Sequence, residues 1–278
     1  MDEDIKEVLL NLLLTLDRVC NKYNLRYYIA FGTCLGAIRH KGFIPWDHDI
    51  DVLMPIADVK KLMELQDEFG ERYFIQTHET DPEFGSISCK LRDSYTTCIW
   101  NDYKNCRFNQ GLNIDIYPFY YAPNSKFGLL LNIWRSHMLK VLTIGDMPIH
   151  QNSMVCFFKN IIQRVYKGEK REKAIKKIKD KLESVKDGNE ILDYYGEDIS
   201  LFSAITYPKE WFAIPQKVEF EGYLVNAPTE PEKYMKRRYG DYMTLPPIEK
   251  RVDGFGEPGA IIDAHKSFKA YYKEMDES

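Results

Sequence analysis

The sequence predicts an α/β fold, in which a mixed β-sheet is flanked by helices. Residues 5–20 repeat apolar side chains at three- and four-residue spacing, which is typical of an amphipathic helix. Residues 112–117 alternate apolar and polar side chains instead, as a strand with one buried face does. Segments of these two kinds follow one another along the chain, and shares of 44% hydrophobic and 29% charged residues are those of an ordinary globular protein.

The composition excludes several classes of protein. The chain has 278 residues, enough for one large domain or two small ones, and its formal net charge of −4 leaves no basic excess for binding a nucleic acid. No stretch reaches the roughly 18 apolar residues of a membrane span, and the start, MDEDIKEVLL, lacks the pattern of a signal peptide. The six cysteines are scattered, without metal-ligand or disulfide-framework spacing. We therefore expect reduced thiols and a cytoplasmic protein.

The first part of the chain is expected to supply one long helix and most of the sheet. Residues 2–24 have helical periodicity, and their acidic start suits the N-terminal end of a helix dipole. Pro55 and Gly70 bound another helical segment. The further elements expected here are a strand at Arg26–Phe31, helices at Cys34–His40 and Ile56–Phe69, and strands at Arg72–Thr77, Ser86–Leu91, Thr96–Trp100 and Leu112–Tyr117.

The middle of the chain, residues 124–187, is predicted to be a helical insertion. It separates a core of residues 1–123 from a segment, 188–278, that completes this core. The elements expected after residue 123 are helices at Phe127–Ile144 and Met154–Tyr166, a charged helix at Lys167–Lys186, a turn-rich segment at 188–207, short strands within 209–225 with Val218, Phe220 and Tyr223 facing inward, a helix at 228–239, a loop at 253–260 and a helix at Ile261–Met275.

Two interpretations of the insertion stay open. Lys167–Lys186 is dense in charge around a narrow apolar stripe, which is most simply a solvated helix with one packed face. The alternative is a peripheral membrane contact through residues 124–186, because an apolar segment beside a basic one can dock at an anionic interface.

A pair of carboxylates lies in the run DIDVLM. If this run is a strand, Asp49 and Asp51 project to one side while Ile50 and Val52 pack on the other. Two neighbouring carboxylates stay ionised together only if a cation or strong donors compensate their repulsion. Mg²⁺ prefers oxygen ligands and commonly takes one or two carboxylates plus substrate phosphates. The pair therefore predicts a site for Mg²⁺, with Mn²⁺ as the alternative.

A small-residue turn precedes this pair. Gly32 and Thr33 follow an apolar run and open a short helix, so the backbone N–H groups there can bind a phosphate. The basic residues Arg39 and Lys41, together with Trp46, lie between the turn and the carboxylates. The combination predicts a phosphate site that faces a metal-binding carboxylate pair.

The run FGTCLGAIRHKGFIPWDHDIDVLMP (Phe31–Pro55) closely resembles the signature of the LicD family of phosphotransferases. This family includes the fukutin-related proteins and belongs to the nucleotidyltransferase superfamily, so the resemblance implies a nucleotidyltransferase-type mixed sheet. Looser similarity extends to GLNIDIYPFYYAP (Gly111–Pro123) and YGDYMTLPPIEKR (Tyr239–Arg251). One departure is His48, since such proteins usually read D-D-D-I-D where this chain has D-H-D-I-D.

The resemblance implies further site residues. Asp115 lies on a half-buried strand, where a carboxylate needs a partner or a task, and capping a nearby turn is the simplest one. Since the superfamily supplies a third carboxylate from a later strand, Asp115 is expected to complete the metal site or to act as general base. Basic residues expected at substrate phosphates are Lys90 and Arg92, as an anion clamp, and Arg238, Lys250 and Arg251.

The activity that the resemblance implies is phosphocholine transfer. The donor would be CDP-choline, the acceptor a hydroxyl of a glycan precursor, lipid-linked or free, of the teichoic acid, lipopolysaccharide or capsule type, and CMP would leave. The expected place is the bacterial cytoplasm, at the inner face of the membrane if the acceptor is lipid-linked. Aromatic side chains bind quaternary ammonium groups, and Trp46 is preferred over Trp100, Tyr117 and Tyr120.

Three other functions stay open on the sequence. A nucleotidyltransferase would move a nucleoside monophosphate from a nucleoside triphosphate to a small acceptor. A D-x-D glycosyltransferase is disfavoured by the Gly-Thr turn ahead of the carboxylates. A non-catalytic glycan-binding protein is disfavoured by the intact set of candidate residues. The donor, the acceptor and the oligomeric state are not determined by these patterns.

Overall fold

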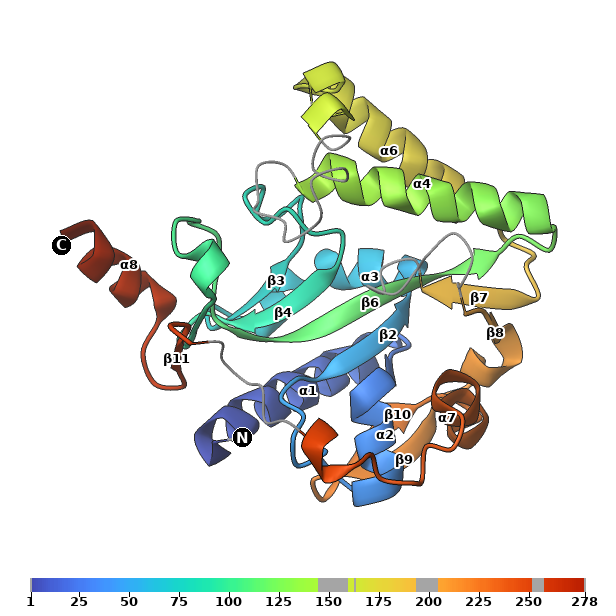
Figure 1. The fold of residues 1–278 in the computed structure, drawn as a ribbon, viewed down its shortest axis with the longest axis horizontal. Helices are drawn as coiled ribbons and strands as arrows, with labels where there is room; N and C mark the ends of the chain where they lie inside the picture. The colour runs from blue at the N-terminus through green and yellow to red at the C-terminus, as the bar shows by residue number, and fades with distance from the viewer. Residues whose placement is uncertain (1, 145–159, 163, 194–204, 252–257, 278) are drawn as a thin grey trace.

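The computed structural model describes residues 2–144, 160–162, 164–193, 205–251 and 258–277 (Figure 1). Its centre is a curled mixed sheet with the strand order β1-β2-β6-β4-β3, extended by β7 and β8. β2 and β6 are parallel, and the other pairs in this sheet are antiparallel. The predicted α/β class is confirmed. The strands are β1 (Tyr28–Ile29), β2 (Asp51–Pro55), β3 (Tyr73–Gln76), β4 (Cys89–Asp93), β6 (Leu112–Ala122), β7 (Glu190–Asp193) and β8 (Tyr207–Pro208).

β6 is the longest strand and organises the sheet. It pairs with β4 and β2 through its first eight residues and with β7 through its last four. The strand therefore continues well past Tyr117, where the alternating pattern of the sequence ended. β4 begins at Cys89, three residues later than expected, because Cys89–Asp93 is the segment that finds partners on β6.

Helix α1 (Glu3–Tyr23) packs its apolar stripe on the sheet, as the periodicity predicted. The Asp2 side chain caps its N-terminus by accepting a hydrogen bond from the Asp4 N–H (2.9 Å), and Asn24 ends it in the left-handed conformation.

Helix α2 (Phe31–His40) begins three residues earlier than expected. Phe31 has a φ of 45°, which turns the chain directly from β1 into the helix, and its N–H donates to the Tyr234 hydroxyl (3.3 Å). Gly32 and Thr33 therefore lie in the first turn of α2, not in a loop ahead of it. The partner that satisfies this helix start is supplied by α7 (Pro231–Tyr239), far along the chain.

A helical layer lies on the side of the sheet drawn above it in Figure 1. The segment expected as one helix at 56–69 divides into α3 (Ile56–Met63) and a 3₁₀ turn at Gln66–Phe69. Helices α4 (Lys126–Ile144) and α6 (Glu169–Glu183) pack on each other through Ile133, Leu139, Leu142, Ile175 and Leu182. Of the helix expected at 154–166, residues 160–162 and 164–165 are helical, Tyr166 is not, and residues 154–159 and 163 lie outside the described residues. The division into 1–123, 124–187 and 188–278 stays a prediction.

Two small two-stranded sheets also contain strands from the C-terminal part. β9 (Gln216–Phe220) and β10 (Tyr223–Ala227) form a hairpin whose turn, Glu221-Gly222, has positive φ at both residues. Tyr223 is 49% exposed, so its predicted inward orientation is wrong.

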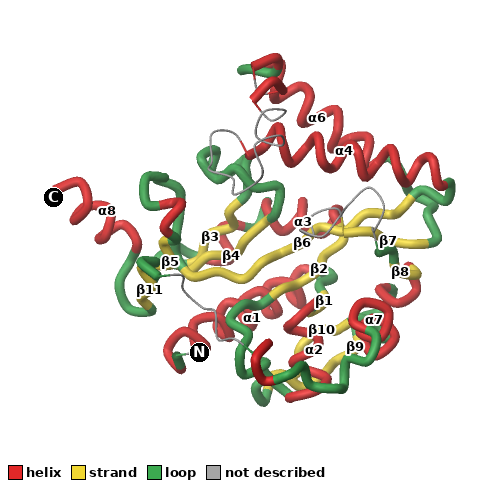
Figure 2. The backbone as a smooth tube through the Cα atoms, in the orientation of Figure 1, coloured by secondary structure: helices red, strands yellow, loops and turns green. Residues whose placement is uncertain are grey.

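β5 (Thr97–Ile99) pairs with β11 (Ile261–Asp263), apart from the main sheet (Figure 2). The helix expected from Ile261 is wrong in its first part, because these residues find hydrogen-bond partners on β5, and α8 (Phe268–Glu277) begins later. Most of the loop expected at 253–260 lies outside the described residues, as does much of the segment 188–207. Among the described residues, no helix is both long and apolar enough to cross a membrane.

Candidate active site

Three neighbouring strands bring Asp51, Asp115 and Lys90 into one row. Asp51 of β2 lies opposite Asp115 of β6, and Asp115 lies opposite Lys90 of β4. Residues opposite one another on paired strands have their side chains on the same face. The Lys90 Nζ consequently lies 2.5 Å from Asp115 Oδ1. The sheet register therefore assembles the three predicted residues that lie far apart in the sequence.

The segment ahead of β2 adds two carboxylates to this row. Asp47 and Asp49 lie with Lys90 and Asp115 on the wall of a cavity of about 300 Å³. The other residues that line this cavity are Leu9, His48, Cys98, Trp100, Leu112 and Asn113. Asp47 was not predicted as a site residue. A signal for it existed, because Asp47, Asp49 and Asp51 recur at every second position.

The charges of this cluster are unbalanced. The pKa of Asp49 is raised to about 7, first by desolvation among the surrounding groups, although the residue itself is exposed, and then by the charge of Asp47. The pKa of Asp51 is raised well above its usual value by burial and then by the charges of Asp49 and Asp115. Lys90 opposes both shifts but is already paired with Asp115. A further cation would therefore stabilise the ionised carboxylates.

The donor set fits Mg²⁺ better than a metal that needs a complete protein cage. Within the described ranges, no three His, Cys, Asp or Glu side chains are arranged to hold a metal ion by themselves. Mg²⁺ does not require this, because it keeps several waters and is commonly bound by one or two carboxylates plus substrate phosphates. Asp49 and Asp51 supply such a pair of oxygen ligands. The assignment of the metal stays a prediction.

Gly32 and Thr33 hold the carboxylate segments in place. A Cβ atom added to Gly32 would lie 2.3 Å from Asp47 Oδ2, so this position leaves the space that the Asp47 carboxylate occupies. The buried Thr33 Oγ1 accepts a hydrogen bond from the Asp51 N–H (2.8 Å). The N-cap residue Ala30 provides no side-chain cap to α2, although the Tyr234 hydroxyl accepts the Phe31 N–H, and the dipole of this helix favours a nearby anion. The contact of Gly32 and Thr33 with a phosphate stays a prediction.

Arg92 does not line the cavity, although it was predicted to form an anion clamp with Lys90. Its guanidinium is buried and donates to Gly111 O (2.6 Å), to Asn113 Oδ1 (3.0 Å) and to the Gln76 side chain. Asn113 in turn donates to Asp115 Oδ2 (3.1 Å). Arg92 is therefore corrected from a substrate contact to a residue that positions Asp115 through Asn113.

A second group of predicted residues forms a separate basic cluster. The Arg251 guanidinium lies 5.3 Å from the centre of the Trp46 ring and donates to Pro246 O (2.8 Å). Arg39 donates to Tyr242 O (2.8 Å), and its pKa is lowered by burial and by the charge of Arg251. The face of Trp46 that was expected to bind a quaternary ammonium group thus already contacts a cation. Lys41 and Lys250 are exposed and line neither this cluster nor the carboxylate cavity.

Arg238 lies over the start of α2. Its guanidinium is 4.2 Å from the centre of the Phe31 ring, and the Phe31 ring contacts Tyr117 edge-on at 5.3 Å. Within the described part of the chain, its Nε has no hydrogen-bond partner. Burial first, and then the charges of Asp115 and Asp51, raise the pKa of Tyr117, which places this ring beside the carboxylates. Arg238 therefore lies at the predicted phosphate end of the site.

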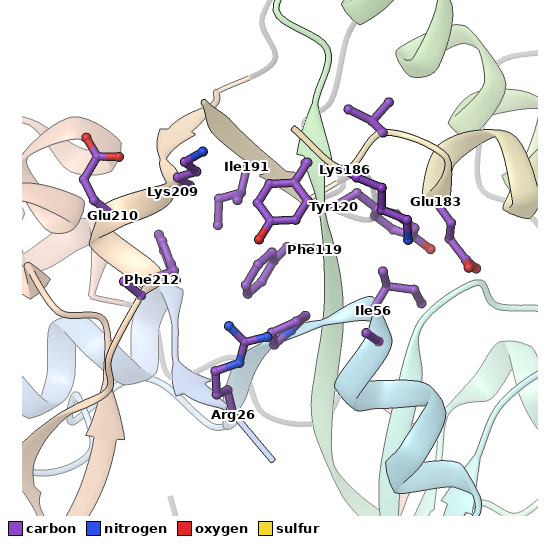
Figure 3. Close-up of a pocket in the computed structure, with 15 residues that line it drawn as sticks. Arg26, Ile56, Phe119, Tyr120, Glu183, Lys186, Ile191, Lys209, Glu210 and Phe212 are labelled. Carbon is purple, nitrogen blue, oxygen red and sulfur yellow. The ribbon is translucent and has the colours of Figure 1, made fainter. Parts of the chain in front are cut away.

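The remaining aromatic candidates, Trp100 and Tyr120, line different cavities. Trp100 lines the carboxylate cavity, whereas Tyr120 lines two larger cavities of about 430 and 660 Å³. Figure 3 shows the first of these, with Arg26, Phe119 and Phe212 around it and none of the four carboxylates. The chemistry of the lining, not the volume, therefore identifies the candidate active site.

Known proteins resemble this chain over the same region. Residues 24–141 match the family described as LicD/FKTN/FKRP, nucleotidyltransferase domain. The chain is 28% identical over 249 residues to the lipopolysaccharide cholinephosphotransferase LicD of Haemophilus influenzae, covering 87% of this chain and 91% of that protein. It is 28% and 27% identical over 97 residues to the ribitol 5-phosphate transferase FKRP of mouse and human, covering 34% of this chain and 17% of FKRP. The family match includes every carboxylate of the site and excludes Arg238 and Arg251.

Proposed function

Because residues 24–141 are a LicD family domain, we propose that this protein is a phosphotransferase that moves phosphocholine from CDP-choline to a hydroxyl of a cell-surface glycan precursor, such as a lipopolysaccharide. The observation that carries the proposal is the row Asp51–Asp115–Lys90 beside Asp47 and Asp49. Asp47, Asp49, Asp115 and Lys90 line a cavity of about 300 Å³, and the buried Asp51 lies next to Asp115 on the neighbouring strand.

In this proposal Asp49 and Asp51 hold Mg²⁺, which, when bound, would neutralise charge on the donor diphosphate. Lys90 offsets the charge that builds up on the transferring phosphoryl oxygens, because in such transfers positioning and electrostatics supply most of the catalysis. Asp115 accepts the proton of the acceptor hydroxyl. The acceptor oxygen bonds to the phosphorus that carries choline, the bond from that phosphorus to the bridging oxygen breaks, and its electron pair leaves with CMP.

Trp100 is the residue that best fits choline recognition. It lines the same cavity as Asp49 and Asp115, and an indole face attracts a quaternary ammonium group. Trp46 fits less well because Arg251 lies over its ring. Replacement of Trp100 by Leu should raise the KM for CDP-choline strongly while leaving turnover of CDP-glycerol nearly unchanged. Equal losses with both donors would remove Trp100 from choline recognition.

Arg39 and Arg251 fit a role at the nucleotide phosphates. Among the described residues, both guanidinium groups donate to backbone carbonyls and neither pairs with a carboxylate, while their charges act on each other. Two neighbouring cations of this kind would be stabilised by an anionic ligand. Exchange of either residue for Met should weaken the binding of every donor that carries the CMP group, whichever alcohol is attached.

The test of the function is CMP release by the purified protein. It is incubated with Mg²⁺, CDP-choline and a lipopolysaccharide or teichoic acid acceptor, beside Asp49→Asn and Asp51→Asn. Asp187→Asn, an exposed position outside the cavity, serves as the matched control. Release that requires Mg²⁺, is lost in the two site variants and persists in the control supports the proposal.

Other outcomes would replace the proposal in defined ways. Release from CDP-ribitol or CDP-glycerol but not from CDP-choline would keep the mechanism and change the donor. Pyrophosphate release from a nucleoside triphosphate would indicate a nucleotidyltransferase. No product release from any donor, together with binding of glycan, would indicate a non-catalytic glycan-binding protein.

A further inference from the structure

Helix α4 is apolar on its outer face as well as on its buried one. The buried side packs Ile133, Leu139 and Leu142 against α6 and β6. At 100° per residue the opposite side carries Phe127, Leu130 and Trp134, which are 78%, 45% and 52% exposed. At 3.6 residues per turn these three side chains fall in one stripe about 60° wide. A helix that is apolar all round is normally buried all round, and no described residue gives the outer stripe the cover that its composition predicts.

Two further apolar side chains are exposed on the next described helical residues. Ile161 and Val165, one helical turn apart, are 41% and 52% exposed. Figure 1 shows α4 at the edge of the molecule on the side of the sheet away from α1. We call Phe127, Leu130 and Trp134 the outer α4 patch.

The charge around the outer α4 patch is basic, although the protein as a whole is acidic. α4 contains no Asp or Glu. Residues 124–168 contain six Lys or Arg and one acidic residue, in a chain with a formal net charge of −4. Lys126 and Arg135 flank the stripe on its two sides, given 100° per residue, and Lys126 and Arg164 are exposed.

We propose that the outer α4 patch docks on an anionic membrane surface, with α4 lying in the plane of the interface. Apolar side chains in the acyl boundary together with Lys and Arg at anionic headgroups are the two interactions that hold interfacial helices. Trp134 suits this position because an indole ring has an apolar body and a polar N–H. A second copy of the chain fits less well, since a two-fold contact would set Lys126 and Arg135 of one copy against the same cations of the other.

The proposal is tested by co-sedimentation of the full-length protein with vesicles, without any donor or acceptor. Vesicles of phosphatidylcholine with phosphatidylglycerol should bind the protein, vesicles of phosphatidylcholine alone should bind it weakly, and added salt should release it. Phe127→Ser/Leu130→Ser/Trp134→Ser should lower the bound fraction at least tenfold. Lys126→Glu/Arg164→Glu should remove the dependence on phosphatidylglycerol.

The matched control changes equally exposed apolar residues elsewhere. Ile214, Leu224 and Ile248 are 73%, 65% and 78% exposed and lie outside α4, so their replacement by Ser should leave binding unchanged. Circular dichroism and thermal melting establish that each variant is folded, and Trp134→Ser alone serves if the triple variant is not.

Three results would overturn the proposal. One is absence of binding to every vesicle, and another is an equal loss in the control variant. The third is a concentration-dependent dimer that the α4 variant abolishes, which would assign the patch to self-association. None of these measurements depends on phosphotransferase activity, so the two proposals can fail separately.

Discussion

Gly32 offers the sharpest test of the candidate site, through the replacement Gly32→Ala. The new methyl group would lie 2.3 Å from Asp47 Oδ2, whereas ordinary contacts of a Cβ atom begin at 3.4 Å. The Asp47 carboxylate must therefore retreat by about 1 Å or rotate away. The backbone N–H of residue 32 is retained, so a phosphate contact made by that group would survive.

The expected effect is large on activity and small on stability. A displacement of about 1 Å in a site of this kind can cost about 100-fold in rate, and we expect that loss in kcat/KM for the donor. The clash involves the end of a flexible side chain, which can move at low cost. Ala also gains about 0.5–1 kcal/mol over Gly in a helix, so the free energy of unfolding should change little.

The assay combines CMP release with a double-mutant cycle. Gly32→Ala is made in the wild type and in Asp47→Ala, where the clash partner is absent. If the methyl group acts through Asp47, it should have almost no additional effect in the second background. Gly42→Ala is the matched control, because its new methyl group would meet only the Glu221 side chain.

Two results would refute this reasoning. Full activity in Gly32→Ala would show that the position of Asp47 is unimportant. An undiminished loss in the Asp47→Ala background would show that the methyl group interferes with the ligand or with the α2 backbone.

The remaining predictions address the support of the site and its metal. Thr33→Val leaves the Asp51 N–H without its acceptor and should lower the free energy of unfolding in urea by about 1–3 kcal/mol. Thr33→Ser keeps the acceptor and should not. Equal losses in the two variants would exclude the hydrogen bond as the cause. Arg92→Met leaves buried acceptors unpaired and should lower the free energy of unfolding by about 1–3 kcal/mol or more. Lys90→Met should instead lower kcat far more than the melting temperature. The reverse ranking would contradict the roles assigned to the two residues. Mg²⁺ at 100 times its Kd should stabilise the wild type by about 2.7 kcal/mol. Asp49→Asn/Asp51→Asn should melt higher than the wild type in EDTA, because repulsion is relieved, and should gain nothing from Mg²⁺; a shift retained in this variant would place the metal elsewhere.

Local periodicity predicted those elements whose buried face is determined by the spacing of apolar side chains along the chain. The stripe of α1 and the alternation of β6 are examples, because a side chain's face depends only on its position within a helix or strand. The strand predicted for the carboxylate pair is confirmed only from Asp51 onward, because Asp49, like Asp47, lies in the segment ahead of β2 that forms no strand. The segment Phe31–Pro55 was enough to place α2 and the carboxylates in one candidate site.

The predictions that failed concern residues whose hydrogen-bond partners lie on a distant segment of the chain. Ile261–Asp263 form a strand because β5 pairs with them, and Arg92 is buried because Gly111 and Asn113 accept its hydrogen bonds. The sequence shows that Lys90 and Arg92 alternate together, but it does not show that one of them points into the interior.

By itself the sequence determined the fold class, the carboxylate-bearing segment and the family resemblance, because each depends on residues that are near neighbours in the chain. Only the tertiary structure decided that Lys90 lies against Asp115, that Arg251 covers Trp46 while Trp100 lines the cavity, and that one face of α4 remains exposed. These contacts depend on strand register and on the packing of distant segments, and no local pattern of side chains specifies either.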